Sequence, residues 1–296
     1  MKYSIEILRL IAVVLITFTH TRYTPDSSLF SYFIIDLPKI GTLTLSIISG
    51  YLYWITAKDK QSIIGKKIRT LAIPYLIANG IVIVLTLCAN YAFGYDFLNR
   101  LSFDYSLLTE GLLSLNSPPV NPPTYFIRDI FIIFCMIELL RNRNLYMLLI
   151  IVPYAVFGNL LIRYDILVLF IAGVSIAYLE KYIKNYHKTI LAVLLLICVL
   201  SVNFFNINSY KYPIALLLFL AFFDVKLKFY NVGGYSYLLH LYHSPIIVCS
   251  FPLLSLFITD SHLSVAVQIL LALSLCYMLY LITRKVEKLK VLSGGR

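Results

Sequence analysis

Hydrophobic residues in this chain of 296 residues lie in long blocks, with short polar segments between them. A block of about 20 apolar residues is long enough to cross the hydrocarbon core of a membrane as a helix. Ten blocks approach this length, although the fourth and the eighth are short. We therefore predict an all-α bundle of about ten transmembrane helices in a single domain, 1–296, with no separate soluble domain. The predicted helices cover residues 4–22, 36–56, 70–93, 125–140, 145–162, 164–180, 188–206, 210–224, 235–258 and 263–283.

The composition agrees with a membrane protein, because 60% of the residues are hydrophobic and only 13% are charged. A soluble chain of this size needs more charge on its surface. With the N-terminus in the cytoplasm, eighteen Lys and Arg residues lie on that side and five on the other. This asymmetry predicts cytoplasmic termini, in a bacterial cytoplasmic or inner membrane. The net charge of +11 needs no nucleic-acid partner, because basic segments can contact anionic membrane lipids.

The first predicted helix carries two polar side chains, Arg9 and His20, in an apolar stretch. They are eleven positions apart, close to three helical turns, so both project from one face about 16 Å apart. Ionisable groups within such a helix are costly and usually face a cavity or a partner. Plainer interpretations stay open: Arg9 reaches the headgroups or pairs with Glu6, and His20 lies at the wet outer interface.

The segment IEILRLIAVVLITFTH, residues 5–20, resembles the opening helix of the membrane acyltransferase-3 family, whose signature is an Arg and a His with ten residues between them. Four further segments resemble motifs of that family, in the family's order. These segments are ISGYLYW at 48–54, KKIRTLAIPYLIAN at 66–79, TYFIRDIF at 124–131 and GGYSYLLHLYHSPI at 233–246.

The resemblance implies transfer of an acyl group, usually acetyl, from a cytoplasmic coenzyme A thioester to a hydroxyl. The acceptor is typically a cell-surface polysaccharide or a lipid-linked sugar. Acetyl-CoA or another acyl-CoA is then expected as a co-substrate, with no cofactor bound tightly. Two departures put the acceptor in doubt, because His240 stands where the family motif has Tyr and Ala78 where it has Trp.

His20 is the candidate catalytic base. A sugar hydroxyl is a weak nucleophile near neutral pH and needs a general base, and histidine titrates closest to neutral pH. Another group must hold the ring in the correct tautomer, and the sequence does not identify it. Arg9 would lie nearer to the entry of the donor, so we expect Arg9 and His20 to line one polar path.

Arg128 and Asp129 are adjacent charges in the predicted helix 125–140, where each is costly without a partner. Adjacent side chains of a helix point about 100° apart, so we expect them to have different partners. We assign both to the catalytic site: Arg128 would bind the donor's phosphates or the acceptor, and Asp129 would orient a histidine. A structural ion pair with charges on other helices is the alternative.

His240 and His243 lie three residues apart on one face of the predicted helix 235–258. This spacing suits a metal ion, but one pair without a third ligand is weak evidence, and we predict no metal site. We assign His243 to substrate binding, with a structural role as the alternative. Pro245 is expected to kink the helix and to free a backbone carbonyl nearby.

The family motifs supply the remaining candidates. Residues assigned to substrate binding beside His243 are Ser49, Asn79 and Tyr125. Residues assigned to the phosphates of coenzyme A are Lys66, Lys67 and Arg69. Basic residues at a cytoplasmic loop also follow from membrane topology alone, so both explanations of these cations stay open.

The longest outer connection, residues 94–124, is our candidate for acceptor selection. It combines aromatic residues, which can stack on a sugar, with the charged residues Asp96, Arg100, Asp104 and Glu110. Aromatic residues are also ordinary at membrane interfaces. A transporter or flippase for a glycan or a lipid-linked sugar is the competing function. Inverted repeats with broken helices would favour it, and the sequence shows no such repeats.

Overall fold

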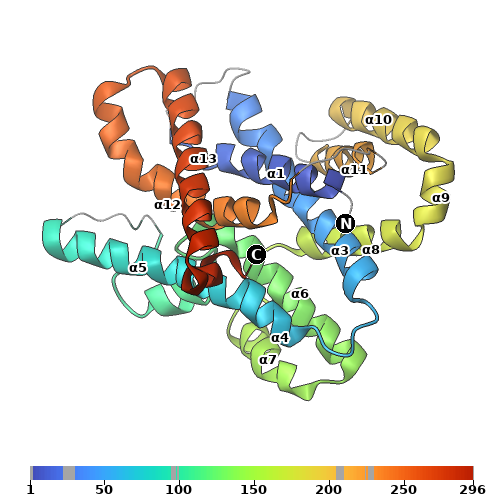
Figure 1. Ribbon diagram of the computed structural model, residues 1–296, viewed down its shortest axis with the longest axis horizontal. Helices are drawn as coiled ribbons and strands as arrows, with labels where there is room; N and C mark the ends of the chain where they lie inside the picture. Colours follow the sequence, from blue (N-terminus) through green and yellow to red (C-terminus); the bar gives the residue numbers. More distant parts are fainter. Residues whose placement is uncertain are drawn as a thin grey trace.

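The computed structural model describes residues 3–22, 31–94, 98, 100–204, 210–223, 225 and 230–295. Within these ranges the chain forms helices and no strands, which confirms the predicted all-α class. Each predicted range overlaps one main helix (Figure 1), although α7 and α11 are shorter than the ranges predicted for them. The main helices are α1 (Tyr3–Phe18), α3 (Ile40–Ala57), α5 (Ile73–Phe93), α6 (Tyr125–Asn142), α7 (Leu148–Phe157), α8 (Tyr164–Tyr178), α10 (His187–Phe204), α11 (Lys211–Ala221), α12 (Gly233–Phe257) and α13 (Ser261–Lys285).

Short helical segments extend or connect the main helices. They are η1 (Tyr32–Asp36), η2 (Leu37–Lys39), α4 (Ile64–Lys67), η3 (Ile68–Ala72), η4 (Leu107–Leu112), η5 (Pro122–Thr124), η6 (Leu145–Met147), α9 (Glu180–Asn185) and η7 (Glu287–Ser293). As a result, α3 and α5 belong to continuous helical segments longer than the predicted spans. Among the described residues, four segments are long and apolar enough to cross a membrane: Tyr32–Ala57, Ile64–Phe93, Gly233–Phe257 and Ser261–Lys285.

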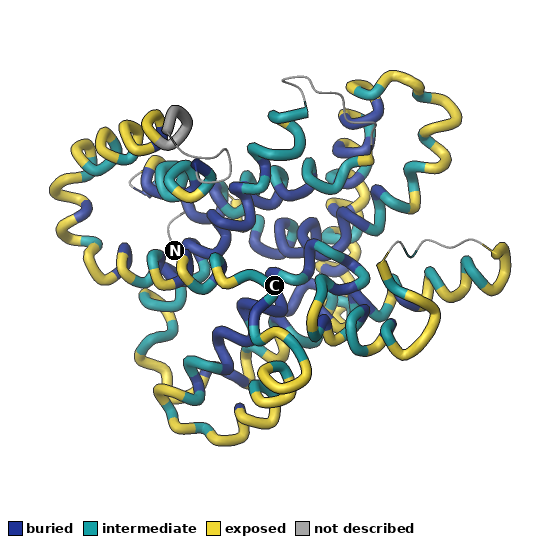
Figure 2. The backbone as a smooth tube through the Cα atoms, turned by 180° about the vertical axis from the view of Figure 1, so that it is seen from behind, coloured by how far each residue is buried: buried dark blue, intermediate teal, exposed yellow. Residues whose placement is uncertain are grey.

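Apolar side chains cover much of the outer surface as well as the core. Figure 2 shows a buried centre surrounded by helices whose outer faces are exposed. Val84 on α5, Leu196 on α10 and Leu270 on α13 are 58%, 58% and 62% exposed. Exposed apolar surface on this scale is unfavourable in water and is normal in lipid. The fold is therefore that of a multi-pass membrane protein.

Glycines let α3 approach its neighbours closely at the centre of the bundle. A Cβ atom at Gly50 would lie 1.9 Å from the backbone oxygen of Phe170 on α8, and one at Gly173 on α8 would lie 2.1 Å from that of Ile47. Small residues at helix crossings allow this approach in membrane proteins. Gly50 of the Ser-Gly motif therefore packs α3 against α8, which leaves the neighbouring Ser49 for another role.

Helix α12 packs against both α1 and α13, and Figure 1 shows α12 and α13 side by side. Pro245 in α12 has no N–H, so the carbonyl of Leu241 one turn earlier lacks its usual helical partner. That carbonyl accepts a hydrogen bond from Asn121 Nδ2 at 2.7 Å. The proline thus ties α12 to the outer connection, and the packing of α12 on α1 brings two distant parts of the sequence together.

Candidate active site

Three histidines meet where α1 packs against α12. His20 follows the end of α1, whereas His240 and His243 lie one turn apart on α12. The ring centroids of His20 and His243 are 5.3 Å apart, and those of His240 and His243 are 6.4 Å apart. His243 is completely buried and His240 is 3% exposed. We call these three residues the histidine cluster.

Most ring nitrogens on the α12 side of the cluster have no hydrogen bond. His243 Nδ1 lies 2.6 Å from the backbone oxygen of Leu239, so Nδ1 carries the proton and donates it to that carbonyl. His243 Nε2 and both ring nitrogens of His240 have no hydrogen-bond partner. Buried polar atoms are nearly always paired, because leaving one unpaired is costly. The exceptions here lie beside two cavities.

One cavity, of about 650 Å³, reaches the cluster at His240. We call it the inner cavity because it adjoins the loop that the basic residues predict to be cytoplasmic. Apolar side chains of α3 and α6 form part of its wall, and cations from α1, from the α3–α4 connection and from α4 form another part. Its polar lining includes Arg9, Ser49, Lys60, Lys66, Lys67 and His240. The structure therefore brings Arg9, Ser49, Lys66 and Lys67 together, while Arg69 is exposed and lies outside this lining.

A second cavity, of about 620 Å³, reaches the cluster at His20. We call it the outer cavity because it adjoins the connection that the sequence predicts to lie outside. Its walls come from the end of α1, from α5, from α12 and from the connection that follows α5. Arg100 and Asn121 of that connection contribute to the lining, together with Arg22. Asp104 and Glu110 do not line it, and Asp96 lies outside the described residues.

His243 lines neither cavity and lies between the residues that do. The two cavities therefore approach one histidine cluster from different sides, with His240 in the first and His20 in the second. Arg9 and His20 line different cavities instead of one continuous path. Arg9 also has a partner one turn away, because its Nη1 lies 3.0 and 3.2 Å from the two carboxylate oxygens of Glu6.

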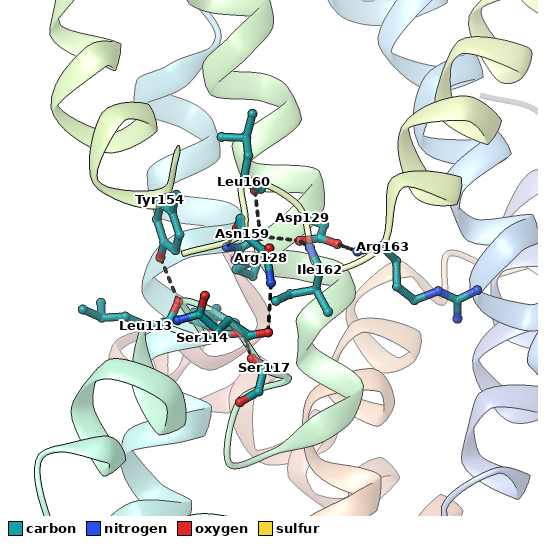
Figure 3. A network of polar contacts seen from close by, with 12 residues as sticks. Leu113, Ser114, Ser117, Arg128, Asp129, Tyr154, Asn159, Leu160, Ile162 and Arg163 are labelled. Carbon is teal, nitrogen blue, oxygen red and sulfur yellow. Dashed lines mark hydrogen bonds and ion pairs between the residues drawn. The ribbon is translucent and has the colours of Figure 1, made fainter. Parts of the chain in front are cut away.

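Arg128 and Asp129 form a second buried cluster, away from the histidines. Arg128 Nη1 donates to Asp129 Oδ1 at 2.7 Å and to the carbonyl of Leu160 at 2.8 Å, while Nη2 donates to the carbonyl of Asn159. Asp129 also accepts hydrogen bonds from the backbone N–H groups of Ile162 and Arg163, at 3.0 and 2.9 Å. Figure 3 shows both side chains directed at the connection between α7 and α8.

The backbone partners of Arg128 and Asp129 differ, as expected, but the two adjacent side chains also bond each other, which was not expected. A long Arg side chain can turn back along its helix, so a 100° difference in direction at Cβ does not keep the charged ends apart. Asp129 binds no histidine: its hydrogen-bond partners are Arg128 and two backbone amides. The pair holds the α7–α8 connection against α6, a structural role.

Two motif residues have structural partners as well. Asn79 is completely buried; its Nδ2 donates to Thr124 Oγ1 at 2.9 Å, and its Oδ1 accepts from the backbone N–H of Asn121 at 3.1 Å. It thus fixes the turn that carries Asn121 into the outer cavity. Tyr125 accepts a hydrogen bond from Arg163 Nη1 at 3.1 Å and lines neither cavity. Neither residue belongs to the lining of the two cavities.

His240 is the site residue that the sequence left without a role. The signal was present in its three-residue spacing from His243, which places both rings on one face of α12. What the spacing cannot show is that this face meets the end of α1. Among the described residues, no group of three His, Cys, Asp or Glu side chains has an arrangement that could hold a metal ion.

Comparison with known proteins identifies the class of this membrane protein. A family model described as an acyltransferase domain matches residues 2–281, almost the whole chain. The chain therefore belongs to the acyltransferase-3 family, as its five motifs predicted.

The chain is also similar to a named bacterial protein over part of its length. The chain is 30% identical over 162 residues to the "Succinoglycan biosynthesis protein ExoH" of Rhizobium meliloti (strain 1021). The match covers 46% of this chain and 41% of ExoH, so it spans less than half of that relative's length. No solved structure matches significantly.

Proposed function

We propose that the protein transfers an acyl group, in the first instance acetyl, from cytoplasmic acyl-CoA to a hydroxyl of a surface polysaccharide or a lipid-linked sugar. The observation that carries this proposal is the pair of cavities that approach one buried histidine cluster from different sides. A donor made inside the cell and an acceptor outside it can then meet at one point within the bundle. The relative's name refers to the biosynthesis of succinoglycan, which supports a carbohydrate acceptor.

The inner cavity suits an acyl-CoA donor. Lys60, Lys66 and Lys67 line its rim in the loop that the distribution of basic residues assigns to the cytoplasm. Cations there can bind the phosphates of coenzyme A, and the apolar wall from α3 and α6 can hold its chain. Entry of the donor from the cytoplasm requires that both termini are cytoplasmic and that the chain crosses the membrane about ten times.

The thioester end of the donor would lie deepest in the bundle, next to His240. A neutral imidazole can donate one N–H, and neither nitrogen of His240 has a hydrogen bond of normal geometry, although the backbone of Pro123 lies close to the ring. We assign that N–H to the carbonyl oxygen of the thioester, which becomes an oxyanion when the acceptor attacks. Ser49, in the same cavity, is a further group that the donor contacts.

The outer cavity suits the acceptor, because part of its wall comes from the connection that the sequence assigned to acceptor selection. His20 lies in this cavity as general base. The hydroxyl oxygen of the sugar attacks the thioester carbon, and the hydroxyl proton passes to His20. The carbon–sulfur bond then breaks, coenzyme A leaves as a thiolate that takes a proton from solvent in the inner cavity, and His20 releases its proton to solvent in the outer cavity. The products are the sugar ester and free coenzyme A.

The test uses purified protein in lipid nanodiscs with radiolabelled acetyl-CoA. The acceptor panel contains neutral polysaccharides and a lipid-linked sugar. We expect wild-type transfer, a loss of about a hundredfold to ten-thousandfold in His20→Ala, and a smaller loss in Arg9→Ala, because Arg9 lies on the donor side. His187→Gln is the matched control: His187 also bonds a backbone carbonyl, that of Leu220 at 2.8 Å, and lines neither cavity.

Two results would contradict the proposal. Unchanged transfer in His20→Ala, with the protein folded, would remove His20 as the base. Movement of a glycan across proteoliposomes without acyl transfer to any acceptor would favour the transporter instead.

A further inference from the structure

A histidine that acts as a base needs a partner on its second nitrogen. The partner keeps the ring in one tautomer, so that the nitrogen facing the substrate has a free lone pair, and it stabilises the ring once it is protonated. Asp129 does not serve His20, because its carboxylate binds Arg128 and the backbone of Ile162 and Arg163. The histidine cluster offers another candidate, because the ring centroid of His243 lies 5.3 Å from that of His20.

We propose that His243 is the positioning residue of His20, and that the carbonyl of Leu239 in turn fixes His243. This inference rests on the proposed function for its catalytic meaning, although the contact between the rings can be tested without it. Three observations carry it: the fixed proton on His243 Nδ1, the unpaired Nε2, and the position of the His20 ring.

The first step is the tautomer of His243. Its Nδ1 is 2.6 Å from the Leu239 carbonyl oxygen, and a carbonyl can only accept a hydrogen bond. The proton of a neutral His243 ring therefore lies on Nδ1, and Nε2 has a lone pair directed away from Leu239. His243 Nε2 can then accept a hydrogen bond and cannot donate one.

The second step is the donor for that lone pair. His243 Nε2 is buried without a partner, and the His20 ring lies next to it with centroids 5.3 Å apart and planes tilted by 56°. At this separation a rotation of the His20 ring brings one of its nitrogens within hydrogen-bonding distance of Nε2. Catalytic hydrogen bonds are often long before substrate binds and shorten in the complex.

The resulting chain of contacts has one direction. The Leu239 carbonyl holds the Nδ1 proton of His243, His243 Nε2 accepts the N–H of His20, and the second nitrogen of His20 faces the outer cavity as the base. A substrate-binding role for His243 fits the structure less well, because this residue is completely buried and lines neither cavity. His243 thus acts through His20 and not on the sugar.

The kinetic test is a double-mutant cycle of His20→Ala and His243→Ala, with His243→Gln as the conservative variant. We expect His243→Ala to lower kcat about 10-fold to 100-fold, by analogy with the loss of groups that orient metal-bound histidines, with the KM of donor and acceptor unchanged. Gln carries an amide that can donate to Leu239 and accept from His20, so His243→Gln should recover part of kcat. The double variant should be no slower than His20→Ala alone.

Losses that multiply in the double variant, or a loss expressed in the KM of the acceptor, would overturn the proposal in favour of an independent role. The matched control is His187→Gln, which makes the same substitution at another histidine that hydrogen-bonds a carbonyl, that of Leu220 at 2.8 Å, and should leave kcat unchanged. Thermal unfolding of each variant identifies a loss of fold.

A second readout does not depend on transfer. Ring-nitrogen NMR of protein labelled isotopically at histidine reports the tautomer of His20 directly. We expect its ring resonances to move in His243→Ala and to stay close to wild type in His243→Gln and His187→Gln. Unchanged His20 resonances in His243→Ala would overturn the contact. Shifted resonances in a protein that transfers no acyl group would retain the contact and reject the proposed function.

Discussion

Two buried polar clusters lie in this bundle, and they differ in whether their polar atoms have partners. The Arg128–Asp129 side chains are 2% and 0% exposed and bind each other and four backbone groups of the α7–α8 connection. In the histidine cluster, three ring nitrogens of His240 and His243 have no hydrogen bond. Only the second cluster adjoins cavities through its members.

The comparison separates two reasons for placing polar groups inside a membrane protein. A charge whose hydrogen bonds are nearly all made by its own chain has little capacity left for a substrate, and it stabilises the fold once its partners are in place. In the Arg128–Asp129 pair, only Arg128 Nε lacks a partner. A polar atom left unpaired beside a cavity costs stability, and function is the usual reason for retaining it.

The largest expected effect in the structural cluster is on stability. Asp129→Ala leaves Arg128 buried without its counter-ion and removes the acceptor for the N–H groups of Ile162 and Arg163. Breaking a buried pair from one side costs about 3–5 kcal/mol, so the thermal midpoint in detergent should fall steeply. His20→Ala is the paired variant and should leave that midpoint close to wild type while it abolishes most of the transfer.

The assignment of a structural role to one cluster and a catalytic role to the other would be wrong if the two variants exchanged their effects. An Asp129→Ala protein with a wild-type midpoint and no transfer would return the carboxylate to the catalytic machinery. Turnover per folded molecule must be compared for this reason, with the folded fraction measured by size-exclusion chromatography.

The difference between the clusters also marks what the sequence could predict. Apolar blocks locate the helices, because burial in lipid requires long apolar runs whatever the neighbours are. The contacts between helices cannot be predicted in the same way. His20 and His243 are far apart in the chain, and no local sequence pattern predicts that they lie side by side. The same holds for Asp129, whose partners are backbone groups of a distant connection and leave no side-chain pattern.

The next expected effect concerns His240 in the inner cavity. If its N–H stabilises the thioester oxyanion, His240→Phe should lower kcat about a hundredfold, the cost of one such donor. His240→Tyr supplies an O–H at the position where family motifs have Tyr, so it should retain more activity than Phe. The two substitutions add rings of similar size against Phe126, whose ring lies 5.7 Å from that of His240, and differ by the hydroxyl alone.

Measurement of kcat with saturating acetyl-CoA distinguishes a donor to the oxyanion from a group that only binds coenzyme A. Equal activity of the Tyr and Phe variants would show that the unpaired nitrogens of His240 have no part in the reaction. The histidine cluster would then reduce to His20 and His243.

The smallest expected effect tests whether satisfied polar groups in the outer connection behave like the Arg128–Asp129 pair. Burial opposes the charge of the Glu110 carboxylate, but hydrogen bonds from Asn116 and Ser117 outweigh burial and lower the pKa of Glu110. Its carboxylate accepts from the backbone N–H groups of Asn116 and Ser117 at 2.9 and 2.8 Å. Because the folded pKa lies below the unfolded one, the stabilisation is full above the unfolded pKa and is lost as pH falls through the folded pKa.

Glu110→Gln should therefore lower the thermal midpoint near neutral pH, and its difference from wild type should shrink on acidification. Asp104→Asn is the matched control: hydrogen bonds from Ser106 also lower the pKa of Asp104, but its side chain is exposed, so any effect on the midpoint should be smaller. If the difference in thermal midpoint between Glu110→Gln and wild type did not change with pH, the charge of Glu110 would not stabilise the connection. The wall of the outer cavity would then owe its stability to packing, unlike the paired charges on α6.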